Sequence, residues 1–159
     1  MPELRPYRRI LAMIQFDAMD GAIAEKALML ARLNRAELEF LHLIEPDGML
    51  DGGYPGSSRQ AGIDDLKRAA LRRLEFLAAS LGAGEARCHA EYGSPRQEFH
   101  EYAREHQPDL IVTGEQAAYL AGSCDVLVLS AAKQSRHGGL PAAIARFFGL
   151  RSRTRVLPR

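Results

Sequence analysis

The stretch from residue 106 to residue 130, HQPDLIVTGEQAAYLAGSCDVLVLS, decides the fold of this chain. It contains two short aliphatic runs, at 110–112 and 126–129, and each follows an aspartate, Asp109 or Asp125. Runs of this kind, with no polar alternation, are typical of strands that are buried on both faces. The two runs therefore predict neighbouring strands of a parallel sheet that is covered by helices.

The rest of the chain alternates strands and helices. Turn-forming residues separate the segments, and the glycine-rich segment 45–60 is expected to be a loop. This alternation implies right-handed crossovers and an α/β fold with an open, doubly wound parallel sheet. Asp20 is expected to cap the first helix. The predicted strands are 10–14, 38–44 and 86–92, and the predicted helices are 21–33, 66–81 and 95–106.

Length and composition favour a single domain in the cytoplasm. The chain has 159 residues, and no apolar run approaches the roughly 20 residues that a membrane span requires. The first ten residues contain no apolar stretch of the kind that marks a signal peptide. Two cysteines, Cys88 and Cys124, show no spacing typical of a metal or redox pair, so we expect reduced thiols.

Charge divides the chain into two parts. Residues 131–159 contain seven basic and no acidic residues, so residues 1–130 carry 14 basic and 20 acidic ones. We therefore predict a domain over 1–130 and a basic extension over 131–159, with a short helix at 141–149.

The extension has three interpretations. Its apolar residues, Ile144, Phe147 and Phe148, could pack on a bare sheet face, or enter a membrane interface beside the basic residues. Binding of nucleic acid is the least favoured of the three, because aromatic and basic residues do not interleave.

Four segments of this sequence, taken together, resemble motifs of the universal stress protein family. They are RRILAMI, EYGSPRQEF, HQPDLIVTG and CDVLVLS, and the resemblance runs from Arg9 to Ser130. It implies a five-stranded parallel sheet of strand order 3-2-1-4-5, of the adenine-nucleotide alpha-hydrolase-like type. It also implies a homodimer, and the last strand, from Asp125 to Leu129, is the expected interface, because a bare apolar edge invites pairing.

The sequence departs from the ATP-binding members of that family at two places. Those members carry an aspartate at the end of the first strand, where this chain has Gln15. They also carry a glycine motif, G-x2-G-x9-G-[ST], whose backbone amides approach the phosphates. Here Gly114 is present, Ala117 takes the second position, and only four residues separate Ala117 from the next glycine. The family's fourth helix has no room there, so we expect it to be missing or replaced by the C-terminal helix.

A degenerate nucleotide pocket is the predicted site, formed by Gln15, Thr113 and Gly114. These residues follow the first and fourth strands, where parallel sheets bind ligands. No cofactor is expected. No metal site is expected either, because His100 and His106 lie six residues apart and do not share a helix face.

No arrangement of serine, histidine and aspartate in the sequence predicts a catalytic triad. The interpretation that we favour is a non-enzymatic binding or regulatory module of the stress response. One alternative is a protein that binds ATP or AMP through Gln15, Thr113 and Gly114. The other is an adaptor that a membrane or a protein partner recruits through the basic, aromatic tail.

Overall fold

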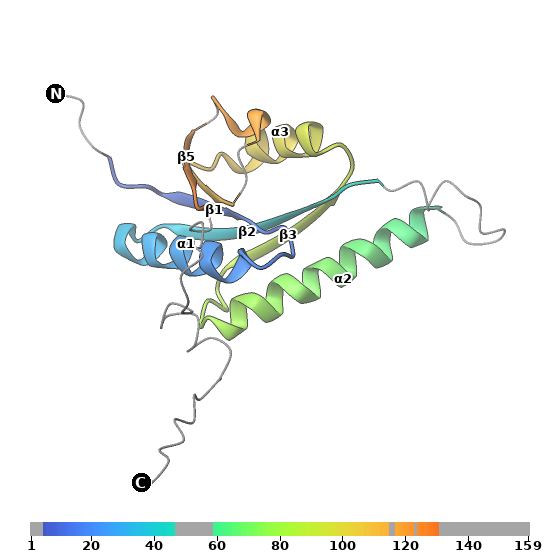
Figure 1. Ribbon diagram of the computed structural model, residues 1–159, viewed down its shortest axis with the longest axis horizontal. Helices are drawn as coiled ribbons and strands as arrows, with labels where there is room; N and C mark the ends of the chain where they lie inside the picture. Colours follow the sequence, from blue (N-terminus) through green and yellow to red (C-terminus); the bar gives the residue numbers. More distant parts are fainter. Residues whose placement is uncertain (1–4, 47–58, 115–116, 123, 131–159) are drawn as a thin grey trace, which may run out of the picture.

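The computed structural model describes residues 5–46, 59–114, 117–122 and 124–130, and within them it confirms the α/β fold (Figure 1). The five strands are parallel and lie in the order β3-β2-β1-β4-β5, as expected. The predicted helix at 141–149 and most of the predicted loop at 45–60 lie outside the described residues. The elements are β1 (Arg9–Met13), α1 (Asp20–Asn34), β2 (Glu37–Ile44), α2 (Arg59–Ser80), β3 (Arg87–Tyr92), α3 (Pro95–His106), β4 (Leu110–Thr113), the short 3-10 helix η1 (Ala118–Leu120) and β5 (Asp125–Val128).

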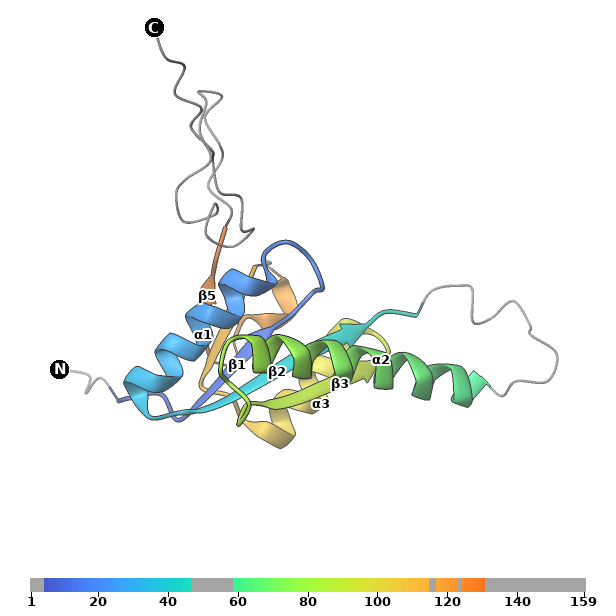
Figure 2. The ribbon, with the colours of Figure 1, turned by 90° about the horizontal axis from the view of Figure 1, so that it is seen from below.

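Helices cover both faces of the sheet. Figures 1 and 2 show α1 and α2 on one face, whereas α3 and η1 lie on the other. The core on the α1 and α2 side includes Ile10, Ile23 and Phe40, all essentially inaccessible to solvent. The core on the α3 side is smaller and includes Phe99 and Ile111. Strands buried on both faces explain why β1 and β4 are continuous aliphatic runs.

The ends of α1 and α3 share one conformation. Each helix ends at a residue in the left-handed region, Arg35 with φ 54° and Gln107 with φ 48°, where glycine is the usual residue. At the start of α1 the predicted cap was wrong by one residue. Met19 occupies the N-cap position without a side-chain cap, and Asp20 is already helical.

Among the described residues between β4 and β5, no α-helix is present where the doubly wound pattern has its fourth. The three residues of η1 stand in its place, and Leu120 is buried against the α3 side of the core. The strand order places β5 at the edge of the sheet, and Val126 on it is 36% exposed. In the described part of the chain, no helix is both long enough and apolar enough to span a membrane.

Candidate functional site

The carboxyl ends of β1 and β4 form the switch point of the sheet, where the strand order reverses. The structure brings Gln15 and Gly114 to this place, since Ala12 pairs with Val112 on the neighbouring strand. Thr113 ends β4, its side chain is buried, and its carbonyl oxygen accepts a hydrogen bond from the Leu129 N–H at 2.7 Å. This hydrogen bond joins Thr113 to the residue that follows β5.

Gly114 packs closely against the first turns of α1. A methyl group added at its Cα would lie 3.1 Å from Cδ1 of Ile23 and 3.6 Å from Cβ of Met19. These side chains therefore occupy much of the space between the loop after β4 and the start of α1.

A carboxylate nevertheless lies at the end of β1. Asp20 comes from the first turn of α1, and its Oδ1 accepts a hydrogen bond from the backbone N–H of Gln15 at 3.0 Å. Burial raises the pKa of Asp20, while the hydrogen bond from Gln15 acts in the opposite direction. The sequence did not predict this contact, because Asp20 was expected to cap α1.

Phe16 follows Gln15 in a conformation that is uncommon for a bulky residue, with φ 62°. Its ring lies over the imidazole of His42 with a centroid distance of 3.9 Å, and the Arg73 guanidinium lies 3.8 Å from its centroid. His42 Nδ1 lies 2.8 Å from the carbonyl oxygen of Ile14, which can only accept a hydrogen bond, so Nδ1 carries the proton. Phe16 is thereby fixed at the carboxyl ends of β1 and β2.

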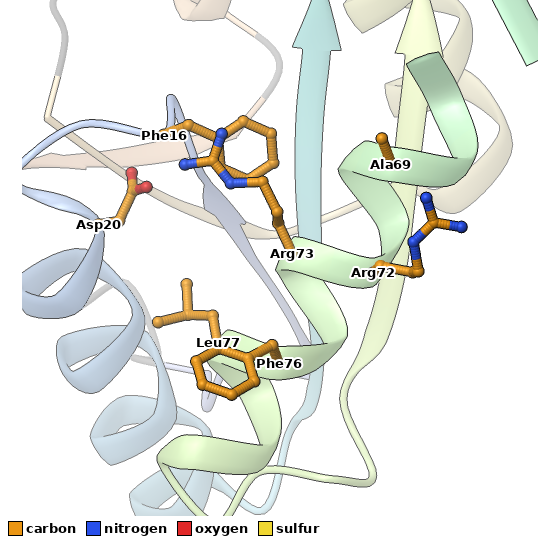
Figure 3. A pocket seen from close by; sticks show the side chains of 7 residues that line it. All are labelled: Phe16, Asp20, Ala69, Arg72, Arg73, Phe76 and Leu77. Carbon is orange, nitrogen blue, oxygen red and sulfur yellow. The ribbon is translucent and has the colours of Figure 1, made fainter. Parts of the chain in front are cut away.

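A hollow of about 450 Å³ opens beside Phe16, between α1 and α2 (Figure 3). Its volume falls within the range of about 300–1,000 Å³ that is usual for small-molecule sites. Figure 3 shows Arg73 reaching toward Phe16, while Arg72 points away from it. The charged groups along the hollow are the guanidinium groups of Arg72 and Arg73 and the carboxylate of Asp20. The hollow is lined by Phe16, Asp20, Ala69, Arg72, Arg73, Phe76 and Leu77.

A second group of polar residues lies near the amino ends of the strands, under the end of α3. His89 and His106 come together there with the buried Glu39. The sequence did not predict this cluster, because its residues come from three elements, β2, β3 and α3, and share no single helix face. A signal was present in the sequence, since Glu39 places a charge within a strand that is otherwise largely apolar.

A parallel sheet of this order, with a helix-covered core and a switch point between β1 and β4, defines a doubly wound α/β protein. The model of the universal stress protein family matches residues 6–133. The chain therefore belongs to the universal stress protein family.

Several solved structures share this fold. The hypothetical protein MJ0577 is 17% identical and superimposes with a TM-score of 0.61, over 81% of this chain and 99% of its own. A protein of the family from Burkholderia pseudomallei is 18% identical, with a TM-score of 0.56, over 79% of this chain and 97% of its own.

A universal stress protein in complex with cAMP is 20% identical, with a TM-score of 0.52, over 78% of this chain and 97% of its own. At these identities the likeness concerns the fold alone. No curated protein sequence matches the chain at a significant level.

Proposed function

We propose that this chain is a cytoplasmic, non-enzymatic binding or regulatory module of the stress response, whose nucleotide pocket is degenerate. The connection between β4 and β5 carries the proposal. Its described residues form the short helix η1, with Leu120 buried, in place of a glycine-rich loop that could surround phosphates. Gly114 is the one glycine retained at the start of that connection, and the side chains of Met19 and Ile23 crowd it.

The chemistry of the described residues supports a role without catalysis. Burial raises the pKa of the Cys88 thiol to about 11, so this cysteine is protonated and weakly nucleophilic at neutral pH. His42 directs Nδ1 to the carbonyl oxygen of Ile14, at the end of β1, and its ring packs at a tilt against that of Phe16. Neither residue is arranged as an activated nucleophile or a free general base.

Isothermal titration with ATP, AMP and cAMP tests the proposal. We expect no binding tighter than about 100 μM, which corresponds to about 5.5 kcal/mol. The physical reason is that the loop after β4 lacks the glycines that would bring backbone amides to the phosphates. A dissociation constant in the low micromolar range, or nucleotide that copurifies with the protein, would show that the pocket is functional.

Nucleotide binding in a different place is the second candidate function. The hollow beside Phe16 favours it, because Arg72 and Arg73 line the hollow and can attract an anion. A structural relative binds cAMP, an anionic nucleotide. If titration detects binding, Arg73→Ala identifies the site. Weaker binding by this variant supports the hollow, and unchanged binding supports Gln15 and Gly114 at the switch point.

The module is proposed to act as a homodimer in which the last strands, from Asp125 to Leu129, pair with each other. Support comes from the position of β5 at the sheet edge and from its exposed Val126. The division into a domain at 1–130 and a basic extension at 131–159 also remains a proposal.

A further inference from the structure

His89 from β3 and His106 from α3 lie next to one buried carboxylate, that of Glu39. Glu39, on β2, is only 5% exposed and lies on the sheet face that α3 covers. Its Oε2 atom is 3.1 Å from Nδ1 of His106 and 3.5 Å from Nε2 of His89. The three ligand atoms all lie within 4.8 Å of one another.

We propose that Glu39, His89 and His106 form a binding site for one divalent transition-metal ion, with zinc the best match. Bond lengths of about 2.0–2.1 Å place the ligand atoms of a tetrahedral zinc site about 3.3 Å apart. The distances of 3.1 and 3.5 Å from Glu39 bracket this value. Two imidazoles and one carboxylate suit zinc, whereas magnesium and calcium prefer oxygen ligands throughout.

One nitrogen atom of the cluster lacks a hydrogen-bond partner among the described residues. His89 Nε2 is buried and makes no hydrogen bond to any of the residues that the structure describes. Buried polar atoms are nearly always satisfied, so an orphaned nitrogen that lies beside a carboxylate points to a ligand. The side chains of His89 and His106 are 24% and 23% exposed, so the cluster lies close to the protein surface.

The surroundings hold the ligands in position. The Tyr102 hydroxyl donates a hydrogen bond to Oε2 of Glu39, and the Tyr102 ring stacks on His106 at 4.2 Å and 7°. Hydrogen bonds of this kind to ligating carboxylates orient metal sites. Arg87 lies 3.8 Å from the other carboxylate oxygen of Glu39 and is largely exposed, so it can turn toward solvent when a cation binds.

A satisfied hydrogen-bond cluster is the competing explanation, with His106 and Tyr102 serving only to neutralise Glu39. The two explanations differ at His89. Because His89 Nε2 makes no hydrogen bond in the described residues, His89→Gln should leave the metal-free protein folded and about as stable as before. If the cluster binds metal, the same change removes a ligand.

The experiment uses full-length protein without a histidine tag, after treatment with a chelator. Zinc stoichiometry and affinity are measured by competition with a chromogenic chelator, and cobalt absorption reports tetrahedral geometry. We expect one zinc ion per chain, no binding of magnesium, and a loss of zinc affinity of at least about tenfold in His89→Gln. Tyr102→Phe, which retains all three ligands, should lose about tenfold.

Two variants serve as matched controls. His100→Gln changes an exposed histidine on α3 outside the cluster, and His137→Gln changes one that lies outside the described residues. Both should bind zinc as the unaltered chain does. Should His89→Gln fail to fold by circular dichroism, His106→Gln takes its place. Absence of zinc binding, or equal binding by the cluster variants and the controls, overturns the proposal.

Discussion

At the scale of single residues, His42 shows how packing changes chemistry. Burial lowers its pKa, while the Ile14 carbonyl that it faces acts in the opposite direction. A histidine whose folded pKa lies below its unfolded value of about 6.5 binds a proton more readily when the chain is unfolded. The stability that depends on a neutral His42 is therefore present above about pH 6.5 and is lost as the pH falls through the folded pKa.

His42→Asn tests this dependence. Asparagine can still donate to the Ile14 carbonyl but does not titrate. We expect the unaltered protein to lose more stability than the variant between about pH 7.5 and about pH 5.5, in urea unfolding at each pH. His89 titrates in both proteins, so the difference between their pH profiles isolates His42. Parallel profiles would mean that His42 is protonated as easily in the folded state as in the unfolded one.

The residue scale is also where the sequence was least informative. Gln15 and Gly114 lie together because the ends of adjacent parallel strands meet at one edge of the sheet. The inward position of Thr113 depends on the strand pleat, and the contact of Asp20 with Gln15 depends on where α1 begins. Neither can be derived from residue types. The cluster of Glu39, His89 and His106 was missed for the same reason, since strand register and the position of α3 bring it together.

At the scale of elements, the end of α1 stores strain that can be relieved. Arg35 is exposed and adopts φ 54°, a region that costs most L-residues about 1–2 kcal/mol. Arg35→Gly should raise the free energy of unfolding by about 0.5–1 kcal/mol, after allowing for the greater flexibility of glycine in the unfolded chain. The corresponding rise in melting temperature is about 1–4 °C.

Glu25→Gly is the matched control for this prediction. It places glycine at an exposed position in the middle of the same helix, where it should lower stability by about 1 kcal/mol. If both variants are destabilised to a similar degree, the left-handed conformation of Arg35 does not strain the chain.

Strands were predicted well where aliphatic runs are buried on both faces, as in β1 and β4. A short run of this kind between turn-forming residues fits few structures other than a buried strand. The helix α2 was predicted less well, since it begins at Arg59, about two turns before the predicted start at residue 66. Gly62 and the acidic residues nearby interrupt the apolar helical spacing, so the sequence pattern did not indicate its first turns. Lys67 on α2 pairs with Glu91 on β3 at 2.8 Å, a tertiary contact that the local pattern does not contain.

At the scale of the whole molecule, the short connection between β4 and β5 bears on how the exposed edge of the sheet is covered. In the described part of the connection between β4 and β5, the three-residue η1 is the only helical element, and Val126 on β5 is exposed. An edge strand that presents unpaired backbone groups and an apolar side chain is prone to pair with another chain. If two copies pair β5 with β5, one isologous interface would both pair the backbone groups of the edge strand and cover Val126.

Light scattering at micromolar concentration should therefore report about twice the chain mass of 17.6 kDa. Val126→Lys should shift the mass toward that of a monomer, because it places a charge opposite its symmetry-related copy in the interface. Phe76→Lys is the control. Phe76 is 77% exposed on α2, and α2 packs on β2 and β3, away from β5. A monomer for the unaltered protein, or a dimer that Val126→Lys leaves intact, would mean that β5 is protected in another way. The basic extension would then be the next candidate to cover it.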